Sequence, residues 1–172
     1  MTKALAFILL LGASAALHAS DNGVLARFDG GVGVIPASNG AGTANADGTL
    51  PNVKLNVVRG VPPAGGPWRI EDLKAVVDAD GEITVKGSGL LLASGNGIGT
   101  TANLSVFATL VCETAAPFVE HSTSAVPLDV NGDFRIEDSL NSAPAECASP
   151  VLLIRATNGT WLAAGLPNHS GN

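Results

Sequence analysis

The stretch ANLSVFATLVC (residues 102–112) decides the fold class of this chain. Every second residue from Leu104 to Cys112 is apolar or small, and the residues between them are mixed. Successive side chains of a strand point to opposite faces of its sheet, so a period of two gathers the apolar residues on one face. The stretch therefore predicts a β-strand that covers a hydrophobic core.

Similar patterns occur along most of the chain. Apolar residues alternate with polar ones over 53–57 and 82–86, and Val151–Ile154 is the continuous apolar run expected of a strand covered on both faces. The spacing of Ile70, Leu73 and Val77 also fits a short helix, but its direct run into a turn favours a strand. We expect strands at 24–35, 53–61, 70–78, 82–92, 102–112, 124–130, 133–139, 150–157 and 160–165.

Three dipeptides favour tight turns between these segments: Asp80-Gly81, Asn131-Gly132 and Asn158-Gly159. Each supplies residues that tolerate a positive φ, and two-residue turns of this kind match the twist of hairpin strands. About nine strands with short turns predict an all-β fold, an antiparallel sandwich of two sheets that is immunoglobulin-like or similar. A β-barrel is the alternative.

The N-terminus has the pattern of a secretory signal peptide. Lys3 precedes an apolar and small-residue run from Ala4 to Ala16, and small residues offer cleavage points after Ala16 or after Ala19. We therefore expect residues 1–19 to be removed and residues 20–172 to form one secreted or periplasmic domain. No later stretch is apolar enough, over 18 residues, to cross a membrane.

Two cysteines, Cys112 and Cys147, occur in the chain. Outside the reducing cytoplasm an even pair predicts one disulfide. The bridge would close a loop of about 36 residues and stabilise the fold by roughly 3–4 kcal/mol on the chain-entropy model.

Charge argues against two classes of partner. Without residues 1–19 the chain keeps eight of its nine Lys and Arg against fifteen Asp and Glu, a formal net charge of −7. Such a surface repels phosphate backbones and anionic membranes, and the sequence has no basic patch interleaved with aromatics. We expect no nucleic-acid partner.

One segment resembles the start of an EF-hand or dockerin calcium loop. Asp129, Asn131 and Asp133 have the spacing of the first three ligands. The later positions depart from the pattern, because Phe134 stands in place of the bend glycine and Leu140 in place of the bidentate Glu. We expect no cofactor; the alternative is a weak calcium site shared with the acidic turn of Asp78, Asp80 and Glu82.

Trp68 and Trp161 are the candidate ligand-binding residues, because tryptophan is enriched at binding hot spots. Core packing is the ordinary alternative for a strand tryptophan. The scarcity of aromatics, with five Phe, two Trp and no Tyr, argues against a sugar-binding platform.

The sequence assembles no catalytic set. His121 and Ser122 are adjacent, so on a strand they point to opposite faces. Carboxylates at Glu71-Asp72, Glu120 and Glu137-Asp138 are available for glycoside hydrolysis, but solvent-facing strand positions commonly carry such charges.

These observations favour a non-catalytic secreted protein that binds a protein or a cell-envelope or matrix component, or that has a structural role at a surface or in a matrix. The loops at 36–52, 62–67 and 93–101 are the expected contact surfaces. A small secreted hydrolase that uses the carboxylates, and a calcium- or saccharide-binding module, are the alternatives.

Overall fold

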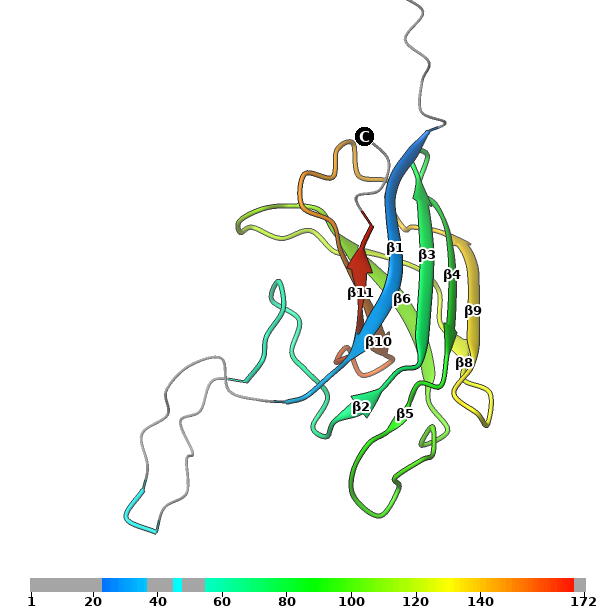
Figure 1. Ribbon diagram of the computed structural model, residues 1–172. Helices are drawn as coiled ribbons and strands as arrows, with labels where there is room; N and C mark the ends of the chain where they lie inside the picture. Colours follow the sequence, from blue (N-terminus) through cyan, green and yellow to red (C-terminus); the bar gives the residue numbers. More distant parts are fainter. Residues whose placement is uncertain (1–22, 37–44, 48–54, 169–172) are drawn as a thin grey trace, which may run out of the picture.

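The computed structural model describes residues 23–36, 45–47 and 55–168. Within these ranges no helix is long and apolar enough to cross a membrane. The predicted signal peptide lies outside them. The regular elements are strands (Figure 1), in the order β1 (Val24–Gly33), β2 (Trp68–Arg69), β3 (Asp72–Asp78), β4 (Glu82–Ser88), β5 (Leu91–Leu92), β6 (Ser105–Val111), β7 (His121–Ser122), β8 (Val126–Pro127), β9 (Phe134–Ser139), β10 (Val151–Ala156) and β11 (Trp161–Pro167).

Most strands belong to one antiparallel sheet. Its order is β7-β6-β10-β11-β1-β3-β4-β9, with β8 also paired to β6, while β2 and β5 form a separate two-stranded sheet. The large sheet curls into a half-barrel (Figure 1). The all-β antiparallel prediction is confirmed, but the predicted sandwich of two packed sheets is not confirmed.

The reason lies in β1, which belongs to both halves of the curl. Its first part, Ala26–Asp29, pairs with β3, and its last part, Gly31–Gly33, pairs with β11. The register with β11 shifts between Phe28 and Gly31, and Gly30 has a φ of 93°. A glycine adopts this conformation without a Cβ clash, so the irregularity bends the strand and lets it continue. One bent strand thus keeps the two halves in a single sheet.

The three predicted turns share one conformation that differs from the expected two-residue type. In each turn the glycine N–H donates to the carbonyl three residues earlier, over 3.0 Å at Gly81, 2.8 Å at Gly132 and 2.8 Å at Gly159. The φ angles of these glycines are 92°, 82° and 89°. The loop of the β3–β4 hairpin therefore contains three residues, 79–81, and the four residues 157–160 between β10 and β11 include the turn at Gly159. The turn at Gly132 leads from β8 to β9, which pair with different strands.

Several predicted strand boundaries change. The ambiguous segment at 70–78 is the strand β3, not a helix. In segment 53–61 the described residues form only isolated bridges, including Val58 with Val61, and Val53 lies outside the described residues. Segment 124–130 contains only the short β8. The two-residue strands β2 and β7 were not expected, because two residues show no period.

The core fills the inside of the curl. The period-two residues of β6 are buried as predicted, with Val106, Ala108 and Leu110 fully inaccessible. The run in β10 is also buried on both faces, at Leu152, Leu153 and Ile154. Residues 112–120 form the loop that connects β6 to β7. Glu120 Oε2 of that loop accepts a hydrogen bond over 2.5 Å from Arg155 Nη1 of β10.

The predicted disulfide joins Cys112 to Cys147. It attaches the end of β6 to the chain that enters β10, where the Ser149 N–H also donates to the Cys112 carbonyl over 3.0 Å. A disulfide is consistent with an extracellular or periplasmic location.

Candidate functional site

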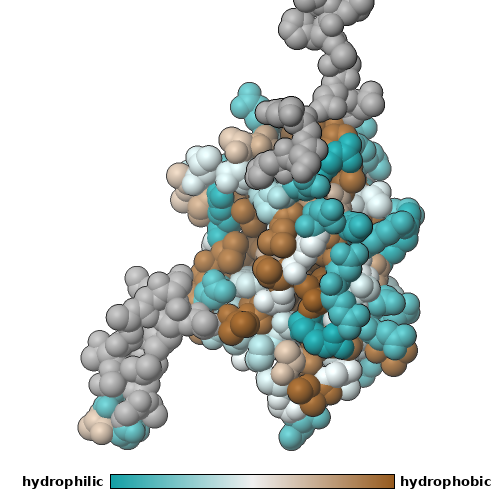
Figure 2. All heavy atoms as spheres, in the orientation of Figure 1, coloured by the Kyte–Doolittle hydropathy of each residue, from teal (hydrophilic) through white to brown (hydrophobic). Residues whose placement is uncertain are grey.

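The outer face of β1, β3, β4 and β9 is the open surface of the curled sheet. On these strands every second side chain points into the core, including Phe28, Ala75, Val85 and Ile136. The intervening residues point outward and are polar or charged at most positions. Figure 2 shows hydrophilic side chains concentrated along the side of the molecule that carries β3, β4 and β9. We call this surface the open face.

Basic residues form a line across the open face. Lys74 of β3 lies directly opposite Lys86 of β4, which lies opposite Arg135 of β9. Because neighbouring strands are about 4.8 Å apart, the backbones of these three residues follow one another at about this spacing. We call these three residues the cationic row. Asp29 of β1 pairs with Lys74 and ends the row on its other side.

A row of like charges opposes stability. Like charges directly opposite each other in an antiparallel pair are unfavourable, and Lys86 faces a cation on each side. The whole chain carries a net charge of −6, yet four of the seven Lys and Arg in the described residues lie on this face: Arg27, Lys74, Lys86 and Arg135. The same face also carries five carboxylates, those of Asp29, Asp72, Asp78, Glu82 and Glu137, so the cationic row, and not the face as a whole, has the charge expected of a site for an anionic group.

Two carboxylates partly neutralise the row. Lys74 Nζ lies 3.8 Å from Asp29 Oδ1, and Arg135 forms an ion pair with Glu137. The hydrogen bond from Arg135 lowers the pKa of Glu137, and the same bond raises the pKa of Arg135. All four side chains are about half exposed, so water screens these pairs. Lys86 lies between them and forms neither pair.

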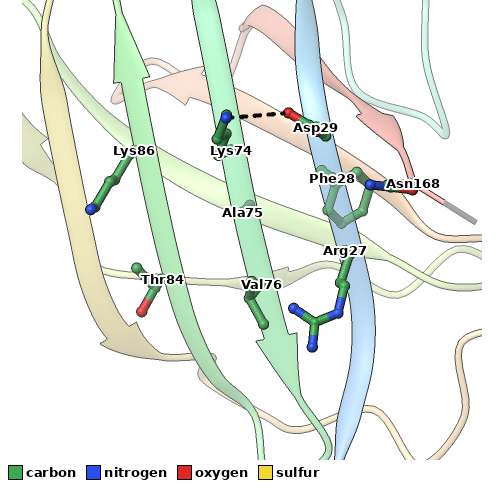
Figure 3. A pocket seen from close by; sticks show the side chains of 9 residues that line it. All are labelled: Arg27, Phe28, Asp29, Lys74, Ala75, Val76, Thr84, Lys86 and Asn168. Atoms are coloured by element: carbon green, nitrogen blue, oxygen red, sulfur yellow. Dashed lines mark ion pairs between the residues drawn. The ribbon is translucent and has the colours of Figure 1, made fainter. Parts of the chain in front are cut away.

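A shallow hollow of about 330 Å³ adjoins the row (Figure 3). Arg27, Lys74 and Lys86 come from three adjacent strands and surround Ala75 and Val76 in this view. The remaining residues of its lining are Phe28, Asp29, Thr84 and Asn168. The hollow thus combines three cations with one carboxylate on a largely apolar floor.

Acidic residues on the open face lie mainly at the ends of the strands. Asp72 begins β3, Asp78 ends it, and Glu82 begins β4. Negative charge therefore borders the cations at both ends of the strands. An anionic chain can cross the strands along the row, whereas one lying parallel to the strands would meet these carboxylates.

The predicted ligand-binding tryptophans are both in the core. Trp68 is 5% exposed and Trp161 is 4% exposed. The Trp161 indole N–H donates to the Asn56 carbonyl over 3.1 Å. Both tryptophans therefore pack in the core, as in the alternative expected from the sequence. Neither ring offers a surface for recognition.

The two acidic turns proposed for calcium are not neighbours. Asp80 lies in the turn before β4, whereas Asp133 lies beyond the other end of β4, where its Oδ1 accepts a hydrogen bond over 3.1 Å from the Gly89 N–H. Asp129 and Asp133 instead pair through their backbones, over 2.9 Å. Asn131 is exposed at the tip of that turn. Over the described ranges no group of three His, Cys, Asp or Glu residues could hold a metal ion.

The candidate catalytic carboxylates have other partners. Glu120 binds Arg155, and Glu71 pairs with Arg69 over 2.6 Å. Backbone N–H groups of Ser124 and Ser139 lower the pKa of Asp138. A general acid needs a raised pKa, so the lowered values of Glu137 and Asp138 are opposite to that requirement.

Among the described residues, His121 forms no hydrogen bond with Ser122 or with a carboxylate that would orient its ring. Its Nδ1 lies 2.8 Å from the Ser142 carbonyl oxygen and 2.9 Å from Ser142 Oγ. Ser122 Oγ instead contacts Thr109 Oγ1 over 2.9 Å. As expected from their adjacency on a strand, His121 and Ser122 serve different neighbours.

The predicted contact loops are described in part. Residues 37–44 and 48–52 of the first loop lie outside the described residues. The loop at 93–101 borders a hollow of about 430 Å³ together with Asn103, Leu128 and Val130. This hollow has no charged residue in its lining.

Sequence reasoning missed the cationic row because the row depends on register. A two-residue turn at Asp80-Gly81 would place Lys74 opposite Gly87. The three-residue loop shifts the pairing by one residue and brings Lys74 opposite Lys86. The equal spacing of these lysines on either side of Asp80 was the available signal.

Comparison of the chain with protein-family models, curated proteins and solved structures found no match.

Proposed function

We propose that this chain is an exported, non-catalytic domain that binds an anionic partner of the cell envelope or extracellular matrix through its open face. The cationic row is the observation that carries the proposal. The signal-peptide pattern and the disulfide support export to the periplasm or beyond.

Energetic conflict at the row also supports a binding role. Lys86 opposite both Lys74 and Arg135 breaks the rule that cross-strand neighbours should attract. Departures from such local rules concentrate at functional sites, where they cost stability for the sake of activity. A bound anionic group would reduce this repulsion between the cations, and this reduction would add to the free energy of binding.

The carboxylate arrangement argues against the hydrolase alternative. The carboxyl groups of Glu137 and Asp138 have lowered pKa values and stay ionised at neutral pH. Neither can therefore serve as a proton donor for a leaving group. Adjacent strand positions also direct them to opposite faces.

The test uses a simple polyanion. Amide chemical shifts of the protein in about 20 mM salt are followed during titration with dextran sulfate, and with neutral dextran as the control ligand. We expect shifts at β3, β4 and β9 with dextran sulfate alone. The double variant Lys74→Gln/Lys86→Gln should weaken binding about tenfold, equal to ~1.4 kcal/mol.

The matched control is Arg69→Gln, which removes an exposed cation of β2 outside the cationic row. It should leave the affinity within about twofold. Shifts that spread evenly over the surface, or equal losses in the two variants, would contradict the proposed site.

A further inference from the structure

We infer that the partner of the open face is a linear acidic polysaccharide that lies across the strands along the cationic row. This inference rests on the proposed function and names the class of ligand. It draws on the spacing of the cations, the charges around them and the lack of exposed aromatic rings on the described part of the open face.

The spacing suits a chain with one anionic group on each sugar. Lys74, Lys86 and Arg135 occupy one cross-strand line, with a step of about 4.8 Å between strands. That step is close to the length of one sugar unit in an extended chain. Carboxylates or sulfates on successive sugars can therefore each approach a different cation.

The surrounding charges determine the direction of the chain. Asp72, Asp78 and Glu82 lie towards the strand ends and would repel an anionic chain that runs parallel to β3. Across the strands, Asp29 is the single carboxylate of the described residues in line with the row, and Glu137 lies one line away, where it pairs with Arg135. Arg27, opposite Val76 in the next line, adds a cation beside the path.

The face recognises charge rather than a sugar ring. Phe28 is 2% exposed and both tryptophans are buried, so within the described open face no aromatic ring is available for stacking. Neutral saccharides would lack their usual platform. Single-stranded nucleic acid also depends on base stacking on aromatic side chains, and the same absence disfavours it.

Each cation of the row binds an anionic group only weakly by itself. Lys74 is 63% exposed in its side chain, and Arg135 is 49% exposed. An exposed ion pair of this kind contributes little alone, so affinity must come from several contacts made by one chain. Binding should therefore increase with the number of linked anionic sugars until the row is filled.

The test measures this dependence on length. Galacturonic acid, its trimer and its hexamer are titrated into the full chain by calorimetry in about 20 mM salt, beside a heparin hexasaccharide and neutral maltohexaose. We expect no measurable binding of the monomer or of maltohexaose, measurable binding of the trimer, and a hexamer affinity within about fivefold of that of the trimer, because three linked anionic sugars fill the row of three cations. The galacturonate and heparin arms distinguish carboxylate from sulfate as the anionic group, and binding of either hexamer supports the inference.

Variants locate the ligand on the row. Lys74→Gln/Lys86→Gln/Arg135→Gln should weaken hexamer binding at least tenfold, whereas Arg69→Gln should change it less than twofold. Asp29→Asn removes the carboxylate in line with the row and should tighten binding about threefold. All these residues are exposed, and a melting temperature within a few degrees of the parent confirms that each variant is folded.

Other results would overturn the inference in recognisable ways. Equal affinity for inorganic phosphate and for the hexamers would indicate a small-anion site. Tighter binding of a ten-residue oligothymidylate would indicate nucleic acid. Binding of poly-L-glutamate at this face without either hexamer would refute the polysaccharide class but leave the proposed function, whereas failure of both poly-L-glutamate and dextran sulfate at this face would refute both.

Discussion

The backbone N–H of Ser124 donates a hydrogen bond over 2.7 Å to Oδ2 of Asp138. Ser124 lies between β7 and β8 at one edge of the curled sheet, and Asp138 lies in β9 at the other. Nearby, the Asn141 N–H donates to the Ser122 carbonyl over 2.9 Å, and the Ser122 N–H donates to Asn141 Oδ1 over 3.0 Å. Two hydrogen bonds to side chains and one between backbones therefore connect the two edges where the strands form no ladder.

We expect Asp138→Ala to destabilise the protein by about 1–2 kcal/mol, because it removes the charged acceptor of two backbone N–H groups, those of Ser124 and Ser139. Urea denaturation measures the change. Glu146→Gln, which alters an exposed carboxylate, is the control and should change stability by less than about 0.5 kcal/mol. Equal effects of the two substitutions would show that the connection adds no stability.

The same carboxylate predicts a dependence on pH. Hydrogen bonds from Ser124 and then Ser139 lower the pKa of Asp138 in the folded state. The folded state therefore binds this proton less readily than the unfolded state, whose Asp has a pKa of about 3.9. The stabilisation is complete above that value and is lost as the pH falls through the folded pKa. Denaturation from pH 6 to pH 2.5 should show a shallower acid loss in Asp138→Asn than in the parent protein.

Lys86→Glu should raise stability while it weakens binding. The new carboxylate would face Lys74 and Arg135 directly, so two repulsions become attractions, against one new repulsion from Glu137. We expect a gain of about 0.5 kcal/mol in unfolding free energy. Dextran sulfate affinity, measured on the same preparation, should fall. A loss of stability would indicate that repulsion between the cations of the row does not destabilise the fold.

Gly132→Ala should be strongly destabilising. Its φ of 82° disfavours any side chain, and an added Cβ would lie 2.6 Å from the Leu90 backbone nitrogen. We expect a loss of at least about 2 kcal/mol in thermal or urea unfolding. At Gly65 an added Cβ meets nothing within 4 Å, so Gly65→Ala is the matched control and should be nearly neutral.

Removal of the disulfide tests the attachment of β6 to β10. Cys112→Ser/Cys147→Ser should lower the unfolding free energy by about 2–4 kcal/mol, because the unfolded chain gains freedom. Thiol titration of the native parent protein should detect no free cysteine among the two. Equal stability of the parent and the variant would show that packing alone holds these segments together.

Part of the candidate site could be foreseen and part could not. The alternation of polar and apolar residues around Lys74 and Lys86 places both on an outer face. Nothing local to the sequence shows that Arg135 continues the line, because 45 residues, 89–133, separate β4 from β9 and include other strands. Trp68 and Trp161 show the reverse case, since residue type suggested recognition and tertiary packing buried both.

The sequence by itself determined the longer strands, the inward residues of β6 and β10, the positions of the three glycine turns and the cysteine pair. These features follow from side-chain alternation, from the φ tolerance of glycine and from thiol chemistry, all of which act over short distances or by residue type. Only the tertiary structure decided that a bend at Gly30 and Gly31 keeps the strands in one sheet, and that Lys74, Lys86 and Arg135 stand in line. Register and strand order depend on free energies summed over the whole fold, and one residue more in a turn changes every pair that follows.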